Sequence, residues 1–339
     1  TIVRDGIAFV KLANFTDRYS KDLEKALKSL QAEQPLKGLI LDLRGNPGGL
    51  LQEAINVSNL FVEKGQEIVS TRGRMSDMTR TYTASDSPLD AGLPIAVLVN
   101  SSSASASEIV SGSLQDLDRA VIMGQRTYGK GLVQTTRSLP YNAQLKVTTA
   151  KYYIPSGRCI QAVDYTHRNA DGSVGKVPDS LQHEFKTRNG RTVKDGGGIL
   201  PDVITSQKKY SSITSSLLSK DLVFDYANYY RTRNDSIGEA SAFRFGQADW
   251  DDFLRFLHNK DYDYITKTES SLEALRKNAE EEGFFGQLEK DYQSLRTRLD
   301  TDKKKDLEKN RKEVEQLLEE EILNRYYYQR GRSAAALSH

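Results

Sequence analysis

The sequence lacks several features that would define other classes of protein. Cys159 is the only cysteine, so the chain cannot form an internal disulfide. No apolar run reaches the roughly 18 residues that a membrane-spanning helix needs. The 48 basic and 46 acidic residues leave a net charge of +2, so no overall field attracts nucleic acid or a membrane surface. We therefore expect no nucleic-acid partner and no transmembrane segment.

The sequence also lacks the common motifs for nucleotides and metals. Neither Gly-x-Gly-x-x-Gly nor Gly-x-x-x-x-Gly-Lys-Ser/Thr is present, which argues against a nucleotide site. There is no His-Glu-x-x-His and no cysteine cluster, so we expect no metal and no organic cofactor. The histidines His167, His183, His258 and His339 lie in polar, loop-like or terminal surroundings, and none ends an apolar strand. Each is predicted to be a surface residue, which disfavours a Ser-His-Asp triad.

Two short segments carry the candidate chemistry. A chain of 339 residues is long enough for two domains with substantial cores. The first segment, residues 100–108, follows the apolar, strand-like run 94–100. The second, residues 127–134, follows another such run, 120–124.

The first segment predicts a strand, a turn and a helix, with serine at the turn. The aliphatic run 94–100 has the length of a buried strand. After the serines, apolar residues recur at helical intervals from Ile109 to Leu117, so a helix begins within the cluster, where serine is a favoured cap. A serine Oγ there lies beside unpaired N–H groups and the positive end of the helix dipole, where an oxyanion is stabilised. The arrangement suits acyl transfer, but an ordinary helix cap fits it too.

The second segment places a lysine between two glycines. Gly129 and Gly131 allow the backbone to turn tightly and to approach other groups closely. An ordinary lysine side chain, with a pKa of roughly 10.4, keeps its proton at neutral pH, so a lysine base must be shifted to about 7 or 8. Desolvation without a carboxylate partner supplies such a shift, and no acidic residue lies within four positions of Lys130. We therefore expect Lys130 to be buried, although a solvated turn fits the same residues.

These two segments and residues 41–50, Leu-Asp-Leu-Arg-Gly-Asn-Pro-Gly-Gly-Leu, resemble the tail-specific, carboxy-terminal processing serine proteases of peptidase family S41. The resemblance runs from about Gly6 to Asp202 and includes the closing Gly-Ile-Leu-Pro-Asp. In that family the nucleophile is the middle serine of Ser-Ala-Ser-Ala-Ser-Glu, and the base is the lysine of the Gly-Lys-Gly segment 25 positions later. The resemblance therefore implies Ser105 as nucleophile and Lys130 as base. The residues alone leave open Ser101, Ser102, Ser103 and Ser107.

The resemblance also implies roles for neighbouring residues. Gln134 would accept a hydrogen bond from the lysine and align it with the serine, without adding a charge. The N–H of Ala106 is the natural first oxyanion donor because it follows the nucleophile, and a second amide would come from the turn Gly48-Gly49.

Three charged residues are expected to be structural. Arg44 and Asp42 end the apolar strand before the Gly48-Gly49 turn, and we expect them to pair beneath it. Asp116 follows on the helix after Ser105 and is interpreted as structural too.

The expected fold class of residues 1–210 is α/β. Alternating strands and helices indicate a sheet covered by helices, with helices after the Gly48-Gly49 turn and after Ser105. The resemblance implies the spiral β-β-α core of crotonases and Clp proteases. Residues 163–195, rich in Asp, Asn, Gly, Ser and Arg, are expected to form hairpins and loops over or beside the site. The expected strands are residues 7–12, 38–43, 67–72, 80–84, 95–100, 121–124, 132–138 and 145–154.

The composition changes from about Ser211, and residues 211–339 are expected to form a mainly α-helical domain. They resemble the helical extension of some bacterial members of the family. The charged run 302–321 predicts a solvated helix face or, alternatively, a contact with a second copy or an adaptor. Apolar residues at helical spacing include Phe253, Phe256 and Leu257, then Leu288, Tyr292, Leu295 and Leu299, then Leu307, Val314, Leu318 and Ile322.

The chain begins at Thr1 without a methionine. Residues 6–12 are similar to the point where related proteases leave their PDZ domain, so the resemblance implies a PDZ domain missing upstream. In the family that domain captures the substrate's C-terminus by strand addition, and without it we expect reduced or deregulated activity. Relatives act in cell envelopes or plastid lumens, which implies an exported, periplasmic protein whose leader is absent from this chain.

The expected function is that of a serine endopeptidase that cleaves protein or peptide tails near their C-terminus through an acyl-enzyme. Two alternatives remain open. One is a non-catalytic scaffold that binds a partner through its helical region. The other is a crotonase-like enzyme acting on acyl thioesters, which is disfavoured because Lys130 and Gln134 have no evident use there.

Overall fold

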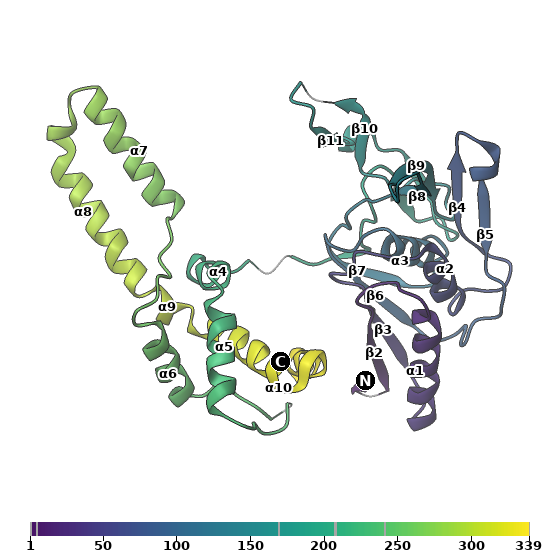
Figure 1. The fold of residues 1–339 in the computed structure, drawn as a ribbon, viewed down its shortest axis with the longest axis horizontal. Coiled ribbons are helices and arrows are strands. Elements are labelled where there is room, and N and C mark those ends of the chain that lie inside the picture. Colours follow the sequence, from purple (N-terminus) through teal and green to yellow (C-terminus); the bar gives the residue numbers. More distant parts are fainter. Residues whose placement is uncertain (1, 5, 169, 207–208, 241, 339) are drawn as a thin grey trace. The chain divides into compact units, whose positions relative to one another are not determined.

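The computed structural model describes residues 2–4, 6–168, 170–206, 209–240 and 242–338. The chain divides into two compact units, residues 1–207 and 208–339. Both units are drawn in Figure 1.

The first unit is built around a six-stranded sheet. In sheet order its strands are β1 (Ile2–Arg4), β2 (Ile7–Lys11), β3 (Gly38–Asp42), β6 (Ile95–Val99), β7 (Val121–Gly124) and β14 (Val203–Ile204). From β2 to β14 neighbouring strands run parallel, and β1 is antiparallel to β2. The central strands are covered on both faces, because alternate residues of each point to opposite faces and most are buried. This explains why β3 and β6 read as continuous apolar runs.

A second sheet has four antiparallel strands. Their order is β5 (Arg80–Thr83), β4 (Glu67–Gly73), β9 (Gln144–Tyr153) and β8 (Leu132–Ser138). Two hairpins follow β9, formed by β10 (Val163–Arg168) with β11 (Val174–Lys176) and by β12 (Glu184–Lys186) with β13 (Thr192–Lys194). Two short 3-10 turns are η1 (Ser76–Met78) and η2 (Asp179–Leu181).

Three helices complete the first unit, namely α1 (Tyr19–Glu33), α2 (Leu51–Asn59) and α3 (Ala106–Asp116). The helix α3 packs against α2 and contacts a strand of each sheet, β7 and β4. Every residue of α3 is buried. Gly112 explains part of this close packing, because a Cβ there would lie 2.7 Å from side-chain atoms of both Ile154 and Ile199. The start of α3 is therefore fixed rigidly in the core.

The regular elements described in the second unit are all helices. They are α4 (Ser212–Ser219), α5 (Leu222–Arg233), α6 (Gln247–Leu257), α7 (Lys267–Glu281), α8 (Phe285–Lys304), α9 (Asp306–Lys309) and α10 (Arg311–Ser338). Their own apolar core contains Tyr226, whose ring meets Phe253 edge-on at 5.0 Å between centroids. From α10 it contains Val314, Leu318 and Ile322, all fully buried.

The predicted fold class is confirmed, with an α/β core followed by a helical region. All eight expected strands are present, each within one residue of its expected ends. The hairpins expected between residues 163 and 195 are also present. One residue of the expected apolar stripe is misassigned, because Leu295 on α8 is half exposed. Among the helices described, none is both long enough and apolar enough to cross a membrane.

Candidate active site

Three loops that carry the predicted site residues leave the same edge of the large sheet. The parallel strands β3, β6 and β7 are consecutive neighbours, so their carboxyl ends lie together. Ligands of open α/β sheets bind at this edge. The loops bond to one another, because Ala104 N–H donates to Asn46 O at 3.0 Å and Tyr128 N–H donates to Ser103 O at 3.0 Å. The fold therefore brings the Gly48-Gly49 turn, the serine run and the lysine segment into one cluster.

Ser105 differs from the other serines of its run. It immediately precedes α3 with φ 56° and ψ −113°, a backbone conformation that is costly for a residue with a Cβ. The hydroxyls of Ser103 and Ser107 donate to the carbonyls of Leu43 and Asn46, at 2.8 Å and 2.9 Å. Ser101 and Ser102 are exposed. Ser105 is half buried, at the turn that sequence analysis associates with a nucleophile.

The Gly48-Gly49 turn lies directly against the Ser105 segment. A Cβ on Gly48, which has φ +97°, would lie 2.8 Å from Ser105 Cβ and 2.9 Å from Ala106 N. The Gly48 N–H donates to Asn46 Oδ1 at 2.9 Å. Gly49 has φ +153°, and a Cβ there would lie 2.1 Å from Phe15 O. Only glycine fits either position, so the turn packs directly against the Ser105 segment at Gly48 and against Phe15 at Gly49.

This contact makes Gly48→Ala a test of how tightly the turn sets the serine. The added methyl group must displace Ser105, and a shift of about 1 Å at a catalytic group costs about 100-fold in rate. We expect kcat/KM for peptide cleavage to fall at least that far. Gly45→Ala is the matched control, because Gly45 also has positive φ but has no atom within 4 Å of its Cβ position. It should lose stability and keep its rate; equal rate losses in the two variants would contradict the contact.

Glu108 connects the serine run to the lysine segment. Its carboxylate is fully buried. Oε1 accepts hydrogen bonds from the Thr127 hydroxyl at 2.5 Å and from Gly129 N–H at 2.6 Å. Oε2 accepts from Ser105 N–H and from Lys130 N–H, each at 2.8 Å. The backbone nitrogens of Ser105 and Lys130 are therefore no farther apart than the sum of those two distances.

Burial raises the pKa of the Glu108 carboxyl, while the hydrogen bonds from Thr127 and from the three backbone amides act in the opposite direction. The desolvation effect is the largest of these contributions.

The side chain of Lys130 is exposed, and its predicted burial is wrong for this structure. The flanking glycines are the buried residues. A Cβ on Gly129 would lie 2.2 Å from Ala162 Cβ, and one on Gly131 would lie 2.5 Å from Gln161 N. Close packing of the glycine backbone anchors the segment on one side, so the lysine side chain extends on the other. The backbone of the segment packs closely, as its glycines predict, but the lysine side chain is exposed.

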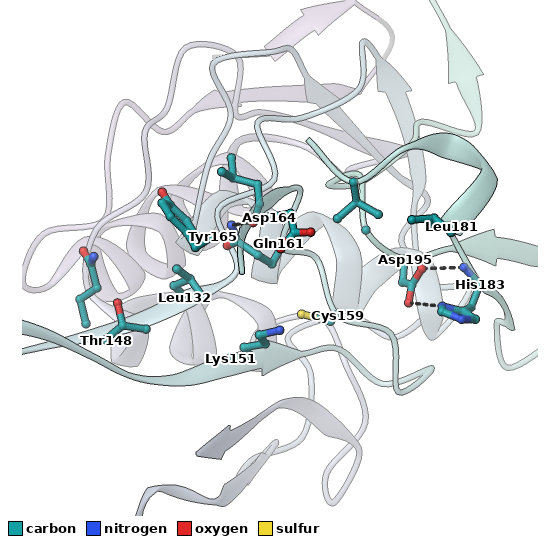
Figure 2. A pocket seen from close by; sticks show the side chains of 14 residues that line it. Leu132, Thr148, Lys151, Cys159, Gln161, Asp164, Tyr165, Leu181, His183 and Asp195 are labelled. Atoms are coloured by element: carbon teal, nitrogen blue, oxygen red, sulfur yellow. Dashed lines mark hydrogen bonds and ion pairs between the residues drawn. The ribbon is translucent and has the colours of Figure 1, made fainter. Parts of the chain in front are cut away.

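Gln134 lies on β8 and lines a cavity of about 540 Å³. Its side chain is exposed, and it pairs in register with Thr148 of β9. The cavity wall includes Gln161, whose Oε1 accepts the Gly131 N–H at 2.7 Å. Figure 2 shows Leu132, Lys151 and Gln161 around this space. The cavity is thus continuous with the residues that hold the lysine segment.

Apolar side chains from the β10–β13 region form another part of the same cavity wall. They include Val163, Val177 and Leu181. Residues 163–195, which were expected over or beside the site, therefore contribute to the wall of this cavity. The exposed His183 and the partly buried Asp195 pair at 3.3 Å on one side of the cavity (Figure 2).

The residues interpreted as structural have structural partners. Arg44 Nε donates to Asp42 Oδ1 at 2.9 Å, which confirms the expected pair. Asp116 Oδ1 accepts from Arg158 Nη2 at 2.8 Å, with both side chains almost fully buried. His183 and His258 are exposed, as predicted, whereas the side chains of His167 and His339 lie outside the described part of the structure.

The residues that join the three loops were not predicted from the sequence. Glu108 stands three positions after Ser105, and this Ser-x-x-Glu spacing could have been recognised as a helix-capping pattern. The capping pattern gives no indication that Glu108 also accepts hydrogen bonds from Gly129 and Lys130. Asn46 links the glycine turn to the residue that follows β2, because its Nδ2–H donates to Leu12 O at 2.9 Å; this contact too has no recognisable pattern in the sequence. Within the described ranges, no group of three or more His, Cys, Asp or Glu side chains could hold a metal ion.

The fold and this cluster define an α/β domain of the peptidase type with an adjoining helical region. Residues 6–168 match the model of peptidase family S41, and residues 213–339 match the model described as "Probable PDZ-protease, C-terminal helical domain". The chain therefore contains an S41 peptidase domain followed by the helical domain of PDZ-proteases.

Similar proteins carry names of the same kind. The carboxy-terminal-processing protease of Bartonella bacilliformis is 48% identical over 167 residues, which cover 48% of this chain and 38% of that protein. The carboxyl-terminal-processing protease of a Picosynechococcus species is 41% identical over 149 residues, 44% of this chain and 35% of that protein. This chain thus spans little more than a third of the length of either relative. The solved photosystem II D1 C-terminal processing protease is 30% identical with a TM-score of 0.45, covering 59% of this chain and 42% of that one.

Proposed function

We propose that this chain is a serine endopeptidase that cleaves protein substrates near their C-terminus through an acyl-enzyme. The observation that supports the proposal most is the joint attachment of the Ser105 and Lys130 backbones to one oxygen of Glu108. A nucleophile and its base must lie within reach of each other, and this shared acceptor keeps their main chains adjacent. The names of the relatives point to substrates that are processed at the carboxy terminus.

In the proposed mechanism, Ser105 Oγ attacks the scissile carbonyl carbon while the neutral amine of Lys130 accepts the hydroxyl proton. The tetrahedral intermediate collapses, its C–N bond breaks, and the lysine ammonium gives the proton to the departing amine. Water then attacks the ester of Ser105 with the lysine again as base, which releases the acid product and restores the serine. Gln134 holds the lysine in line.

The oxyanion is stabilised by backbone amides in this proposal. Ala106 is the first residue of α3, and the N–H groups at a helix start have no partner within the helix. The second donor comes from the Gly48-Gly49 turn. The Gly48 N–H must leave Asn46 Oδ1 to serve, whereas the described part of the structure gives the Gly49 N–H no such acceptor.

Substrate binding supplies the desolvation that Lys130 lacks in the free structure. A polypeptide laid between the serine turn and the cavity would cover the exposed lysine and exclude water from it. The apolar wall of Val163, Val177 and Leu181 favours an apolar substrate side chain near the cut. The free arrangement is therefore an open state that the substrate completes.

We assign catalysis to residues 1–210 and a separate role to the helical residues 211–339. The helical region is the candidate contact for a second copy or an adaptor. We further propose an exported, periplasmic location, by analogy with the family that the motifs resemble.

Product mapping tests this function. An unfolded protein with an apolar C-terminal tail is incubated with the chain, and the fragments are identified by mass spectrometry. We expect cuts close to the tail, after apolar residues. An acyl thioester offered under the same conditions should not be hydrolysed. Thioester hydrolysis without proteolysis would contradict the proposal, and binding of the protein without cleavage would indicate a scaffold.

A further inference from the structure

The carboxylate of Glu108 is saturated with hydrogen bonds from two different loops. A carboxylate offers about four acceptor positions, and four donors occupy them here. Two donors, Thr127 Oγ1–H and Gly129 N–H, bind Oε1, and the other two, Ser105 N–H and Lys130 N–H, bind Oε2. Three of the four donors belong to the lysine segment, and the fourth belongs to the candidate nucleophile.

This arrangement is costly for a residue that only caps a helix. Removing a carboxylate from water is expensive unless hydrogen bonds or a cation compensate it. Among the residues that the structure describes, no lysine, arginine or histidine side chain forms an ion pair with Glu108. Charge-assisted hydrogen bonds from three backbone amides and the Thr127 hydroxyl therefore offset part of this cost. An ordinary helix cap needs one or two such bonds, made within its own helix.

We propose that Glu108 is a positioning residue for catalysis, which sets the approach of the Lys130 segment to Ser105. This inference rests on the proposed Ser-Lys mechanism. The carboxylate holds Ser105 at its strained φ of 56° by its N–H, and it holds Lys130 by the neighbouring N–H on the same oxygen. Strained backbone persists only where the surroundings determine it, and Glu108 supplies that constraint.

The role requires a glutamate that is ionised. In glutamine, one oxygen is replaced by an NH2 group, which is a donor and would face two other donors. In aspartate, the side chain is one methylene shorter and cannot reach both loops from the same helix position. Each change breaks part of this attachment while leaving the rest of α3 intact.

Protonation should have the same effect as the glutamine substitution. Burial raises the pKa of Glu108, so the folded chain takes up this proton at a higher pH than the unfolded chain does. Between the folded-state and unfolded-state pKa values of Glu108, lowering the pH stabilises the folded chain through this group. The same protonation removes a hydrogen-bond acceptor from the carboxylate. Of the residues that donate to Glu108, only Lys130 carries a titratable side chain. Acid should therefore detach the loops before it unfolds the chain.

The experiment compares Glu108→Gln and Glu108→Asp with Glu319→Gln in the full chain. Glu319 is the matched control because it is also buried and accepts a backbone amide, that of Phe245 at 2.6 Å, in the helical unit. For Glu108→Gln we expect kcat to fall at least about 100-fold with KM within about 3-fold of wild type, since alignment and not binding is lost. Glu108→Asp should recover part of kcat, and Glu319→Gln should leave both constants unchanged.

Amide hydrogen exchange provides a readout that does not depend on activity. In Glu108→Gln the amides of Ser105, Gly129 or Lys130 should exchange at least about 10-fold faster, while those of the α3 interior remain protected. Unchanged exchange at all three, or a kcat within 3-fold of wild type, would overturn the proposal. If the wild type cuts no peptide, the proposed function fails and exchange still decides the role of Glu108.

A measurement on the wild type tests the proposal even if the Glu108 variants do not fold. The Glu108 carboxyl carbon and the Ser105 and Lys130 amides should titrate together by NMR as the pH is lowered. Separate titration midpoints for the carboxyl and for the two amides would refute the shared attachment.

Discussion

Peptide cleavage by Ser105→Ala should fall at least about 10⁴-fold in kcat, which is the scale on which removal of a nucleophile leaves only residual catalysis. The folded structure should persist, because the hydroxyls that bond to backbone carbonyls belong to Ser103 and Ser107 instead. The measurement is kcat/KM with a fluorogenic peptide, alongside covalent labelling by a fluorophosphonate. Wild type should be labelled once, on the peptide that contains Ser105, and the variant should not be labelled.

Ser101→Ala is the matched control for this experiment. Ser101 belongs to the same run and is exposed, so its loss should change the rate by less than about 2-fold. Label found on Ser101 or Ser102, or cleavage that survives in Ser105→Ala, would assign the nucleophile elsewhere. Ser103→Ala is less informative, because it removes a bond to Leu43 O and would disturb the turn.

Local sequence patterns were sufficient to predict most of the strands and helices of the α/β core. The strands β7 and β8 begin and end at the expected residues, because their apolar or alternating runs are bounded by glycine and polar residues. The parallel strand order β3-β6-β7 was not predicted from the sequence. This order places the three loops at one edge of the large sheet. In the helical region, the helical spacing of apolar residues overestimated the burial of Leu295. A hairpin of two helices buries a narrower stripe of each helix than a bundle does.

The site was less predictable than the fold. The residues indicated a serine at a helix start, but the choice of Ser105 needed the family resemblance, since four other serines fit the pattern. The bonds of Glu108 to Gly129 and Lys130 span 21 and 22 positions, and sequence spacing contains no information on such tertiary contacts. Likewise, glycines flanking Lys130 predicted close packing of the backbone, which is observed, but not on which side the lysine would lie.

The exposed lysine and the strained serine together describe a site that is organised in its main chain and incomplete in its side chains. Ser105, Gly48 and the lysine segment are fixed by contacts with neighbouring backbone. The side chain of Lys130, which the proposed mechanism requires to be desolvated, is exposed. On the proposed mechanism, a bound tail would complete the site by covering the lysine.

Replacement of Lys130 should therefore remove the pH dependence of cleavage together with most of the rate. In wild type, kcat/KM should rise with pH, since only the uncharged amine can accept the serine proton. Lys130→Ala should lose about 10²- to 10⁴-fold in kcat, the usual contribution of a general base, and its residual activity should lack that rise. The exposed Lys146 on β9 provides the control, as Lys146→Ala should keep the wild-type profile.

Lys130→Arg separates the proton acceptor from the positive charge. Arginine fits an exposed position and keeps the charge, but its guanidinium does not deprotonate in proteins, so this variant should be as inactive as Lys130→Ala. Small primary amines added to Lys130→Ala should restore part of kcat, most strongly at a pH where the free amine predominates. An active Lys130→Arg with an unaltered pH profile would show that another group takes the proton. The pair His183 and Asp195, which lines the cavity together with Gln134, would then be the first candidate to replace it.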